Sequence, residues 1–561
     1  MKNNNNNNLI LEEYESEFSY YRTRSNLNIS FNRIAFIFFI FLAISIIFST
    51  KAIYLASLKK DKIANININT EFRSSIVDRN ENLIAKTVVT QNVGIDPNLV
   101  IDKKKLLINL KLIFPEKNYK QFKLIEKKLN GDKFFYIHKQ ISYERLEELL
   151  FLGDKSIITE RRISRIYPQE NLFSHIVGQI DDDNNGISGL EKSFDFELKK
   201  NDQPLKLTVD MNIQYLIREE LIKSEKIFKN LGSAAILMNI NSGEIISLVS
   251  LPDFNLNKRE KIEDLKYTNK VTKGVYELGS VFKTITLAAA FDNKIIEPST
   301  HFKKLEKKIY CAGNPITEYD NKLPSDLTAE QILIRSSNIG SVRIAQKLGI
   351  EKYKSFLNKI GILEKVDFDI EEVGQPISFR WGKCKLATTS FGHGITTTPL
   401  QLAKAYAIIS NGGYDVKPTI IKVDNNHVKT KILSDDVSNK INPILRKVVS
   451  TKEGTAHFAD VFGYEVGGKT GTADKVKNGV YTKDKINTFV SVFPISKPKF
   501  VLVVLLDEPK PSKDYIYYYR DGRAPYKGNW RNTAGWTSVE IAGKIIEKIG
   551  PILATKYIEV N

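Results

Sequence analysis

Two side chains near the middle of the chain combine a nucleophile with a base. Ser280 and Lys283 stand three positions apart in a segment that opens an apolar helical run. Residues three apart share a helix face, so the hydroxyl and the amine should be neighbours. The positive end of the helix dipole, together with desolvation, favours a neutral Lys283 that can accept the serine proton. The pair predicts a serine nucleophile, although a lone S-x-x-K is common in a lysine-rich chain.

A second segment offers a hydroxyl and a carboxamide two residues apart. Ser336 and Asn338 follow a helical run, and a turn there would aim both side chains into a cleft. Ser336 would then relay a proton, and Asn338 would hold a substrate amide. The alternative is that these residues cap a helix, a role common for Ser and Asn.

A third segment, at residues 467–472, places two glycines before a lysine flanked by hydroxyls. The glycines permit close approach of a ligand to backbone, and the lysine and hydroxyls suit a carboxylate. A phosphate-binding loop is excluded because strand-forming residues, and no helix, follow the lysine. The candidate carboxylate ligands are Lys469, Thr470 and Thr472, with Gly471 between them.

Composition permits a large folded protein to position these groups. The chain has 561 residues, 42% hydrophobic and 26% charged, which excludes a disordered, collagen-like or multi-span membrane chain and predicts two or three folded units. The net charge of +18 comes from lysines spread along the chain, which favours a solvated surface over a nucleic-acid site. The two cysteines, Cys311 and Cys384, cannot form a Cys-only metal site, and whether they form a disulfide is left open.

The soluble part is expected to contain two domains. Short β-like runs alternate with lysine-rich helices, such as 142–152, over residues 65–200, and a break follows at 201–204. Beyond it the pattern predicts an α+β domain over 205–552 with an antiparallel sheet flanked by helices. Its expected elements are hairpins formed by strands 233–240 with 244–250 and 487–495 with 499–508, and helices 213–224 and 538–549.

An apolar run near the N-terminus predicts a transmembrane anchor over residues 31–57. Residues 34–48 alone span only about 22 Å of helix, but continuation to Leu55 gives about 33 Å, with Lys51 able to snorkel. A polar, asparagine-rich tail of residues 1–30 should be disordered. The alternatives are a cleaved signal peptide or a buried helix, and basic residues on both sides leave the orientation open.

Together and in this order, S-x-x-K, S-x-N and K-T-G resemble the active-site triplet of penicillin-binding proteins and serine β-lactamases. Arg73–Arg79 is also similar to the R-G-x-I-x-D-R motif of class B penicillin-binding proteins, with Ser74 in place of glycine. Other segments similar to pedestal and transpeptidase motifs of that class are Arg165–Pro168, His175–Gly178, Gly189–Glu191, Leu207–Gln214, Phe391–Tyr406 and Gly468–Lys475. The resemblance covers nearly everything from Arg73 to the last helix.

The resemblance implies a peptidoglycan D,D-transpeptidase whose soluble part comprises a non-catalytic pedestal and a serine transpeptidase domain. Ser280 would attack the D-Ala–D-Ala carbonyl, with Lys283 as base and Ser336 passing a proton to the leaving D-Ala. The backbone N–H groups of Ser280 and Thr472 would hold the oxyanion. The substrate-binding residues implied are Asn338, Lys469, Thr470, Gly471 and Thr472. No organic cofactor and no metal is expected.

Three other positions are interpreted alongside this resemblance. His393 stands between two glycines and is interpreted as structural, because the implied mechanism uses a lysine base. Trp536, in a T-A-G-W segment, is expected near the mouth of the cleft. Ser74, which replaces a motif glycine, affects only a local turn.

The resemblance also implies partners and a location. The partners would be peptidoglycan stem peptides and β-lactam antibiotics, with no nucleic acid. The chain would cross the inner membrane once, with a cytoplasmic N-terminus and a periplasmic catalytic domain. A compact pedestal and the T-A-G-W segment look division-type (FtsI-like), which implies an FtsW-like glycan polymerase and other divisome membrane proteins as partners. The alternatives are an elongation-type enzyme, or a β-lactamase or β-lactam sensor; about 130 residues before the domain argue against a β-lactamase.

Overall fold

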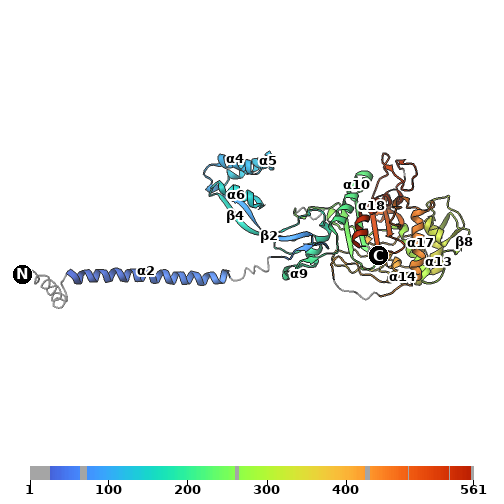
Figure 1. The fold of residues 1–561 in the computed structure, drawn as a ribbon, viewed down its shortest axis with the longest axis horizontal. Helices are drawn as coiled ribbons and strands as arrows, with labels where there is room; N and C mark the ends of the chain where they lie inside the picture. Colours follow the sequence, from blue (N-terminus) through green and yellow to red (C-terminus); the bar gives the residue numbers. More distant parts are fainter. Residues whose placement is uncertain are drawn as a thin grey trace, which may run out of the picture. The chain divides into compact units, whose positions relative to one another are not determined.

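The first of two units in this computed structural model contains a single described helix. The structure describes residues 26–63, 72–258, 265–423, 430–477, 479–529 and 531–557. The chain divides into Met1–Thr70 and Glu71–Asn561, and the first unit holds α2 (Asn26–Ile63) (Figure 1). Its part Arg33–Ile53 is long and apolar enough to cross a membrane. The helix extends beyond both ends of the predicted anchor, so residues 26–30, which the sequence predicts as disordered tail, are helical. The rest of the predicted tail, residues 1–25, lies outside the described residues.

An antiparallel sheet forms the centre of the second unit. Its strand order is β12-β13-β14-β6-β7. The bounds are β6 (Gly232–Asn239), β7 (Ile245–Leu251), β12 (Gly467–Lys477), β13 (Val480–Phe493) and β14 (Phe500–Asp507). Both predicted hairpins are confirmed, and β14 pairs with β6 to join them into one sheet. The strand β12, which carries the K-T-G segment, lies at one edge.

Helices cover both faces of this sheet. Every residue of its central strand β14 is therefore buried. Helices α10 (Met211–Phe228) and α18 (Ser538–Tyr557) pack on each other and on strands of the sheet. Helix α16 (Pro399–Ser410) packs on β6 and β14, and it also contacts α11 (Phe282–Asp292) and α17 (Asp435–Ser450). The predicted α+β architecture is confirmed.

Shorter elements lie between β7 and α16, and three of their helices contact α11. They include β9 (Lys308–Cys311), β10 (Asn314–Thr317), α12 (Ala329–Ile334), α13 (Asn338–Leu348), α14 (Ile350–Lys359) and α15 (Lys383–Thr389). Two-residue strands are β8 (His301–Phe302), β11 (Leu327–Thr328), β15 (Ile516–Tyr517) and β16 (Tyr526–Lys527). A disulfide between Cys311 and Cys384 ties β9 to α15, which answers the question that the sequence left open.

The pedestal consists of a head and a base that belong to different hydrophobic cores. In the head, β2 (Leu83–Ile95) pairs with β3 (Phe135–Ile141) and β4 (Ile157–Ile166). These strands share a core with α4 (Lys103–Ile113), α5 (Tyr119–Leu129) and α6 (Tyr143–Phe151). The base contains β1 (Ile76–Val77), β5 (Leu205–Lys206), α7 (Ser174–Val177), α8 (Gly189–Ser193) and α9 (Asp195–Lys200). Its buried Ile76, Phe173 and Leu190 share a hydrophobic core with the five-stranded antiparallel sheet and its helices.

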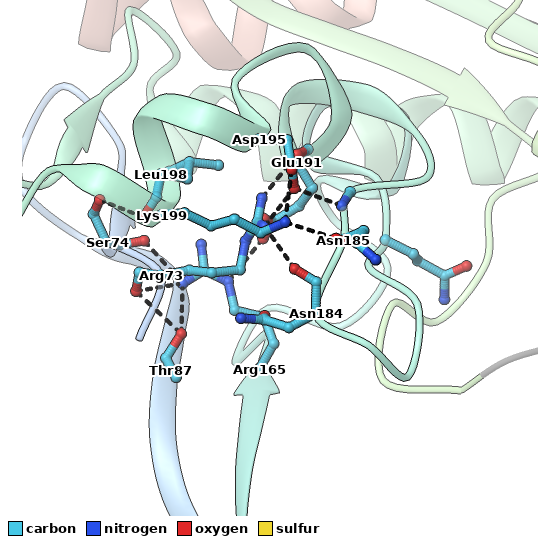
Figure 2. A network of polar contacts seen from close by, with 12 residues as sticks. Arg73, Ser74, Thr87, Arg165, Asn184, Asn185, Glu191, Asp195, Leu198 and Lys199 are labelled. Atoms are coloured by element: carbon cyan, nitrogen blue, oxygen red, sulfur yellow. Dashed lines mark hydrogen bonds and ion pairs between the residues drawn. The ribbon is translucent and has the colours of Figure 1, made fainter. Parts of the chain in front are cut away.

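A buried ion-pair network holds the base together. Figure 2 shows Arg73 and Arg165 converging on Glu191, whose carboxylate lies 2.8 Å from Arg73 Nε and 2.7 Å from Arg165 Nε. The side chains of Arg73 and Glu191 have no exposed surface, and that of Arg165 is 1% exposed. Ser74, in the place of the motif glycine, donates its hydroxyl to the carbonyls of Leu198 and Asn201, so the local turn tolerates a side chain.

Replacing Glu191 by glutamine should destabilise the protein strongly. The substitution removes the charge that two buried guanidinium groups share, and such a loss costs about 3–5 kcal/mol of the free energy of unfolding. Urea unfolding of the full chain in detergent measures it. The matched control is Glu116→Gln, which breaks an exposed pair with Arg145 and should change stability by less than about 1 kcal/mol. Equal effects of the two substitutions would contradict this role for Glu191.

Candidate active site

The candidate nucleophile lies in a short turn beside the edge strand of the sheet. Ser280 belongs to η3 (Gly279–Val281), a 3-10 turn that leads directly into α11. Gly279 has φ of 62°, and a Cβ there would lie 2.9 Å from the carbonyl oxygen of Thr472. Glycine at 279 therefore lets β12 approach the turn. Ser280 lines a cleft of about 750 Å³.

Lys283 is the second residue of α11, three positions after the serine, and its side chain is buried. Its Nζ donates to the Ser336 carbonyl oxygen (2.6 Å) and to Asn338 Oδ1 (2.7 Å), and lies 3.1 Å from Ser336 Oγ. Burial lowers the pKa of Lys283 to about 7, against the opposing effect of the Glu318 carboxylate. A neutral amine has two hydrogens, which these two acceptors take, and one lone pair that stays available for a proton.

Ser336 connects the first segment with the third. It lies between α12 and α13 with φ of 57°, a left-handed conformation that is rare for a residue with a side chain. Its Oγ is 3.0 Å from Lys469 Nζ as well as 3.1 Å from Lys283 Nζ. Lys469 is fully buried, and burial together with the nearby Lys283 holds its pKa well below the ordinary value. One hydroxyl thus contacts both lysine amines.

The helix-cap alternative for the second segment applies to the residue between the two candidates. Ser337 caps α13, because its Oγ accepts a hydrogen bond from the Gly340 N–H (2.9 Å). Ser336 and Asn338 both line the cleft instead. The Asn338 amide is held in place, since its Nδ2 donates to the Thr317 carbonyl oxygen (2.8 Å) and its Oδ1 accepts from Lys283.

The third segment presents its two hydroxyls to the cleft. Thr470 and Thr472 line the cleft, and the fully buried Lys469 lies behind them with its Nζ 3.1 Å from the Thr470 carbonyl oxygen. Thr472 Oγ1 accepts from the N–H of Ala534 (2.9 Å). A Cβ on Gly471 would lie 2.2 Å from the Leu278 carbonyl oxygen, so glycine permits the close packing of β12 on the turn.

The cleft also contains residues outside the three segments. Trp536 lines it, as the sequence predicted. His393, interpreted from the sequence as structural, lines it too, with Nδ1 3.6 Å from Glu277 Oε2 and its ring stacked on Tyr481. Other lining residues that sequence reasoning missed are Tyr319, Asp320, Thr455, His457, Phe458, Tyr519 and Arg531. Within the described ranges, no cluster of three or more His, Cys, Asp or Glu side chains is placed to hold a metal ion.

Comparison with known proteins follows the same division of the chain. Residues 233–524 match the penicillin-binding protein transpeptidase domain family, and residues 70–226 match the penicillin-binding protein dimerisation domain family. The chain is 28% identical to a probable peptidoglycan D,D-transpeptidase FtsI of Caulobacter vibrioides over 86% of this chain and 82% of that protein. It is 30% identical to the stage V sporulation protein D of Bacillus subtilis over 90% of this chain and 84% of that protein.

A third relative is a probable peptidoglycan D,D-transpeptidase PenA of Neisseria meningitidis, 27% identical over 68% of this chain and 70% of that protein. The transpeptidase match alone covers more than half of the chain, and it contains all three motifs that meet in the cleft. A dimerisation domain precedes it, as in the pedestal-bearing class. The chain therefore belongs to the class B penicillin-binding proteins, the FtsI-like peptidoglycan D,D-transpeptidases.

Proposed function

We propose that this protein cross-links peptidoglycan stem peptides during septal wall synthesis, with Ser280 as the nucleophile. The observation that carries the catalytic assignment is the meeting of three separate segments at one hydroxyl. Ser336 Oγ lies within 3.1 Å of the amine of Lys283 and within 3.0 Å of the amine of Lys469. The Ser280 hydroxyl faces the same cleft. This arrangement supports acyl transfer with Ser280 as the nucleophile, Lys283 as the base and Ser336 as the proton relay.

In the first half-reaction, Ser280 Oγ attacks the carbonyl carbon of the penultimate D-alanine, and its proton passes to the Lys283 amine. The bond from that carbon to the terminal D-alanine nitrogen then breaks. Ser336 gives its proton to the leaving amine and receives the one held by Lys283, which is 3.1 Å away. The products are free D-alanine, an ester on Ser280 and a neutral Lys283.

The substrate is held by groups from opposite walls of the cleft. The backbone N–H groups of Ser280 and Thr472 stabilise the oxyanion, a contact worth about 3–4 kcal/mol per donor. Close packing of Gly279 against Thr472 supports this pairing, because it brings the two backbones together. The hydroxyls of Thr470 and Thr472 bind the terminal carboxylate, with Lys469 behind them, and Asn338 binds a substrate amide.

In the second half-reaction, an amine of another stem peptide attacks the ester carbonyl. The neutral Lys283 accepts a proton from the attacking amine, the C–O bond to Ser280 breaks, and Lys283 passes that proton to the serine oxygen. The cross-linked product carries a new amide bond. The same residues therefore serve both steps, with Lys283 alternating between neutral and protonated forms.

The proposed location is the inner membrane, with α2 as a single-pass anchor and the catalytic domain in the periplasm. The apolar part of α2, Arg33–Ile53, supports the anchor. The disulfide between Cys311 and Cys384 supports the orientation, because structural disulfides form in oxidising compartments such as the periplasm and are rare in the cytosol. The N-terminus would then be cytoplasmic.

The septal role, in preference to an elongation role, is supported by the FtsI-like pattern of the sequence. Relatives named FtsI match in Caulobacter vibrioides and in Buchnera aphidicola, both at 28% identity. The last three residues of the T-A-G-W segment form η5 (Ala534–Trp536), which contributes to the cleft. We infer an FtsW-like glycan polymerase and other divisome membrane proteins as partners, docked on the anchor and the pedestal.

A β-lactam should form a long-lived adduct on Ser280. The cleft is built for acyl transfer to an amine, so water should release the drug slowly. Mass spectrometry of the penicillin-treated protein should locate the adduct on the peptide that contains Ser280, and Ser280→Ala should abolish it. An adduct elsewhere would refute the assignment of the nucleophile, and rapid turnover of the drug would identify a β-lactamase instead.

Acylation should depend on a neutral Lys283. The pKa of Lys283 is lowered to about 7, so the acylation rate should rise with pH through that value and reach a plateau above it. One pH unit below the pKa, the acylation rate should be about tenfold lower than the plateau. Lys283→Arg should lose acylation, since arginine keeps its proton. The control is Lys440→Arg. Lys440 lies on α17, outside the cleft, and pairs with Glu297 and Asp436, so this substitution should leave the acylation rate unchanged. Near wild-type acylation by Lys283→Arg would rule out this base.

Depletion of the protein in its host should block septation. The expected phenotype is filamentous cells without completed septa, observed by microscopy with a fluorescent wall label. A plasmid copy of the wild type should restore division, and a Ser280→Ala copy should not. Rounded cells that continue to divide would instead assign the protein to elongation.

A further inference from the structure

Glu318 is a buried carboxylate, next to the active-site turn, that belongs to none of the three motifs. It directly follows β10 and is 8% exposed. Its Oε1 accepts hydrogen bonds from Ser337 Oγ (2.5 Å) and from the Ile339 N–H (3.1 Å). Its Oε2 accepts from the Asn338 N–H (2.8 Å). All three donors belong to consecutive residues at the start of α13.

These bonds bear directly on the turn that carries Ser336. The left-handed conformation of Ser336, with φ of 57°, persists only where the surrounding structure fixes it. Glu318 fixes the chain directly after Ser336, and its negative charge suits the N-terminus of α13. The carbonyl and hydroxyl oxygens of Ser336 then point to Lys283, at 2.6 Å and 3.1 Å.

The residue before Glu318 orients the other partner of the lysine. The Thr317 carbonyl oxygen accepts from Asn338 Nδ2 (2.8 Å), which turns Asn338 Oδ1 toward Lys283 (2.7 Å). Residues 317 and 318 together therefore position every oxygen that Lys283 contacts. The β9–β10 hairpin that leads to them is tied to α15 by the disulfide between Cys311 and Cys384.

Glu318 is also the carboxylate whose charge acts on Lys283. Two amines, on α11 and on β12, are buried around Ser336, and the Lys283 charge disfavours the protonated form of Lys469. The Glu318 charge raises the pKa of Lys283, while burial lowers it to about 7. Without that charge the pKa of Lys283 would fall further.

We propose that Glu318 is a positioning residue for acyl transfer, which holds the Ser336 turn against Lys283 and supplies a negative charge beside that buried lysine. This inference rests on the proposed function of Ser280, Lys283 and Ser336. It differs from a simple helix-capping role, which would affect stability alone. The proposal has two components, the length of the Glu318 side chain and its negative charge, and different substitutions test them separately.

The test compares Glu318→Gln and Glu318→Asp in the full chain in detergent. The rate of Ser280 labelling by a fluorescent penicillin is measured from pH 5.5 to 9, together with the midpoint of thermal unfolding. Glu306→Gln, at an exposed glutamate paired with Arg343, is the matched control and should change neither plateau nor pH profile.

Glu318→Gln removes the charge, so the rising limb of the pH profile should move to lower pH, and the plateau should fall about 10- to 100-fold through misplacement of Ser336. Glu318→Asp keeps the charge but shortens the side chain, so the plateau should fall while the limb stays in place. A folded Glu318→Gln protein with an unshifted limb would overturn the proposal, as would wild-type plateaus in both variants.

If Glu318→Gln does not fold, the Glu318→Asp variant tests the proposal. A wild-type plateau rate in Glu318→Asp refutes the positioning role. A lowered plateau rate with the rising part of the pH profile unshifted supports it. Wild-type protein that forms no Ser280 adduct would refute the proposed function, and this inference with it. Normal wild-type labelling with unaffected Glu318 variants would refute this inference alone.

Discussion

The carboxylate of Glu191, which has no exposed surface, holds two guanidinium groups from segments that lie far apart in the chain. Taking these charges out of water is costly unless they meet, so the base of the pedestal forms only when Arg73, Arg165 and Glu191 come together. Directly beside this network, the Leu205 N–H donates to the Ser75 carbonyl oxygen (2.8 Å), and β1 pairs with β5. The start of the transpeptidase region is therefore anchored on the ion pairs.

The cost of burying a charge has a different consequence in the active site than in the pedestal. The pedestal buries arginines, which keep their protons and so must be paired with carboxylates. The cleft buries two lysines around Ser336, and the Glu318 carboxylate opposes the effect of burial on one of them, Lys283. Lysine can give up its proton, so the unbalanced charge is relieved by deprotonation, and burial creates a base. The choice of cation thus separates a structural network from a chemical one.

Local patterns predicted the hairpins, the flanking helices and the three motifs, because each depends on residues close together in sequence. They could not predict the contacts of Glu318, whose hydrogen-bond donors lie 19 to 21 residues away in the chain. Nor could they predict the disulfide, which joins cysteines 73 residues apart. They also ended the last helix at residue 549, before Gly550 and Pro551. Helix α18 continues to Tyr557 because tertiary contacts override that signal: Leu553 is buried and the Tyr557 hydroxyl donates to Asp210.

The pairing of β14 with β6 has a consequence for how the chain reaches its folded state. The centre of the sheet joins residues 232–239 to residues 500–507, so the hydrophobic strand β6 has no partner on that side until almost the whole chain is present. Contacts so distant in sequence make folding slow and leave strand edges open to aggregation. In a chain delivered N-terminus first, the apolar β6–β7 hairpin therefore has one edge without its β14 partner until residues 500–507 arrive.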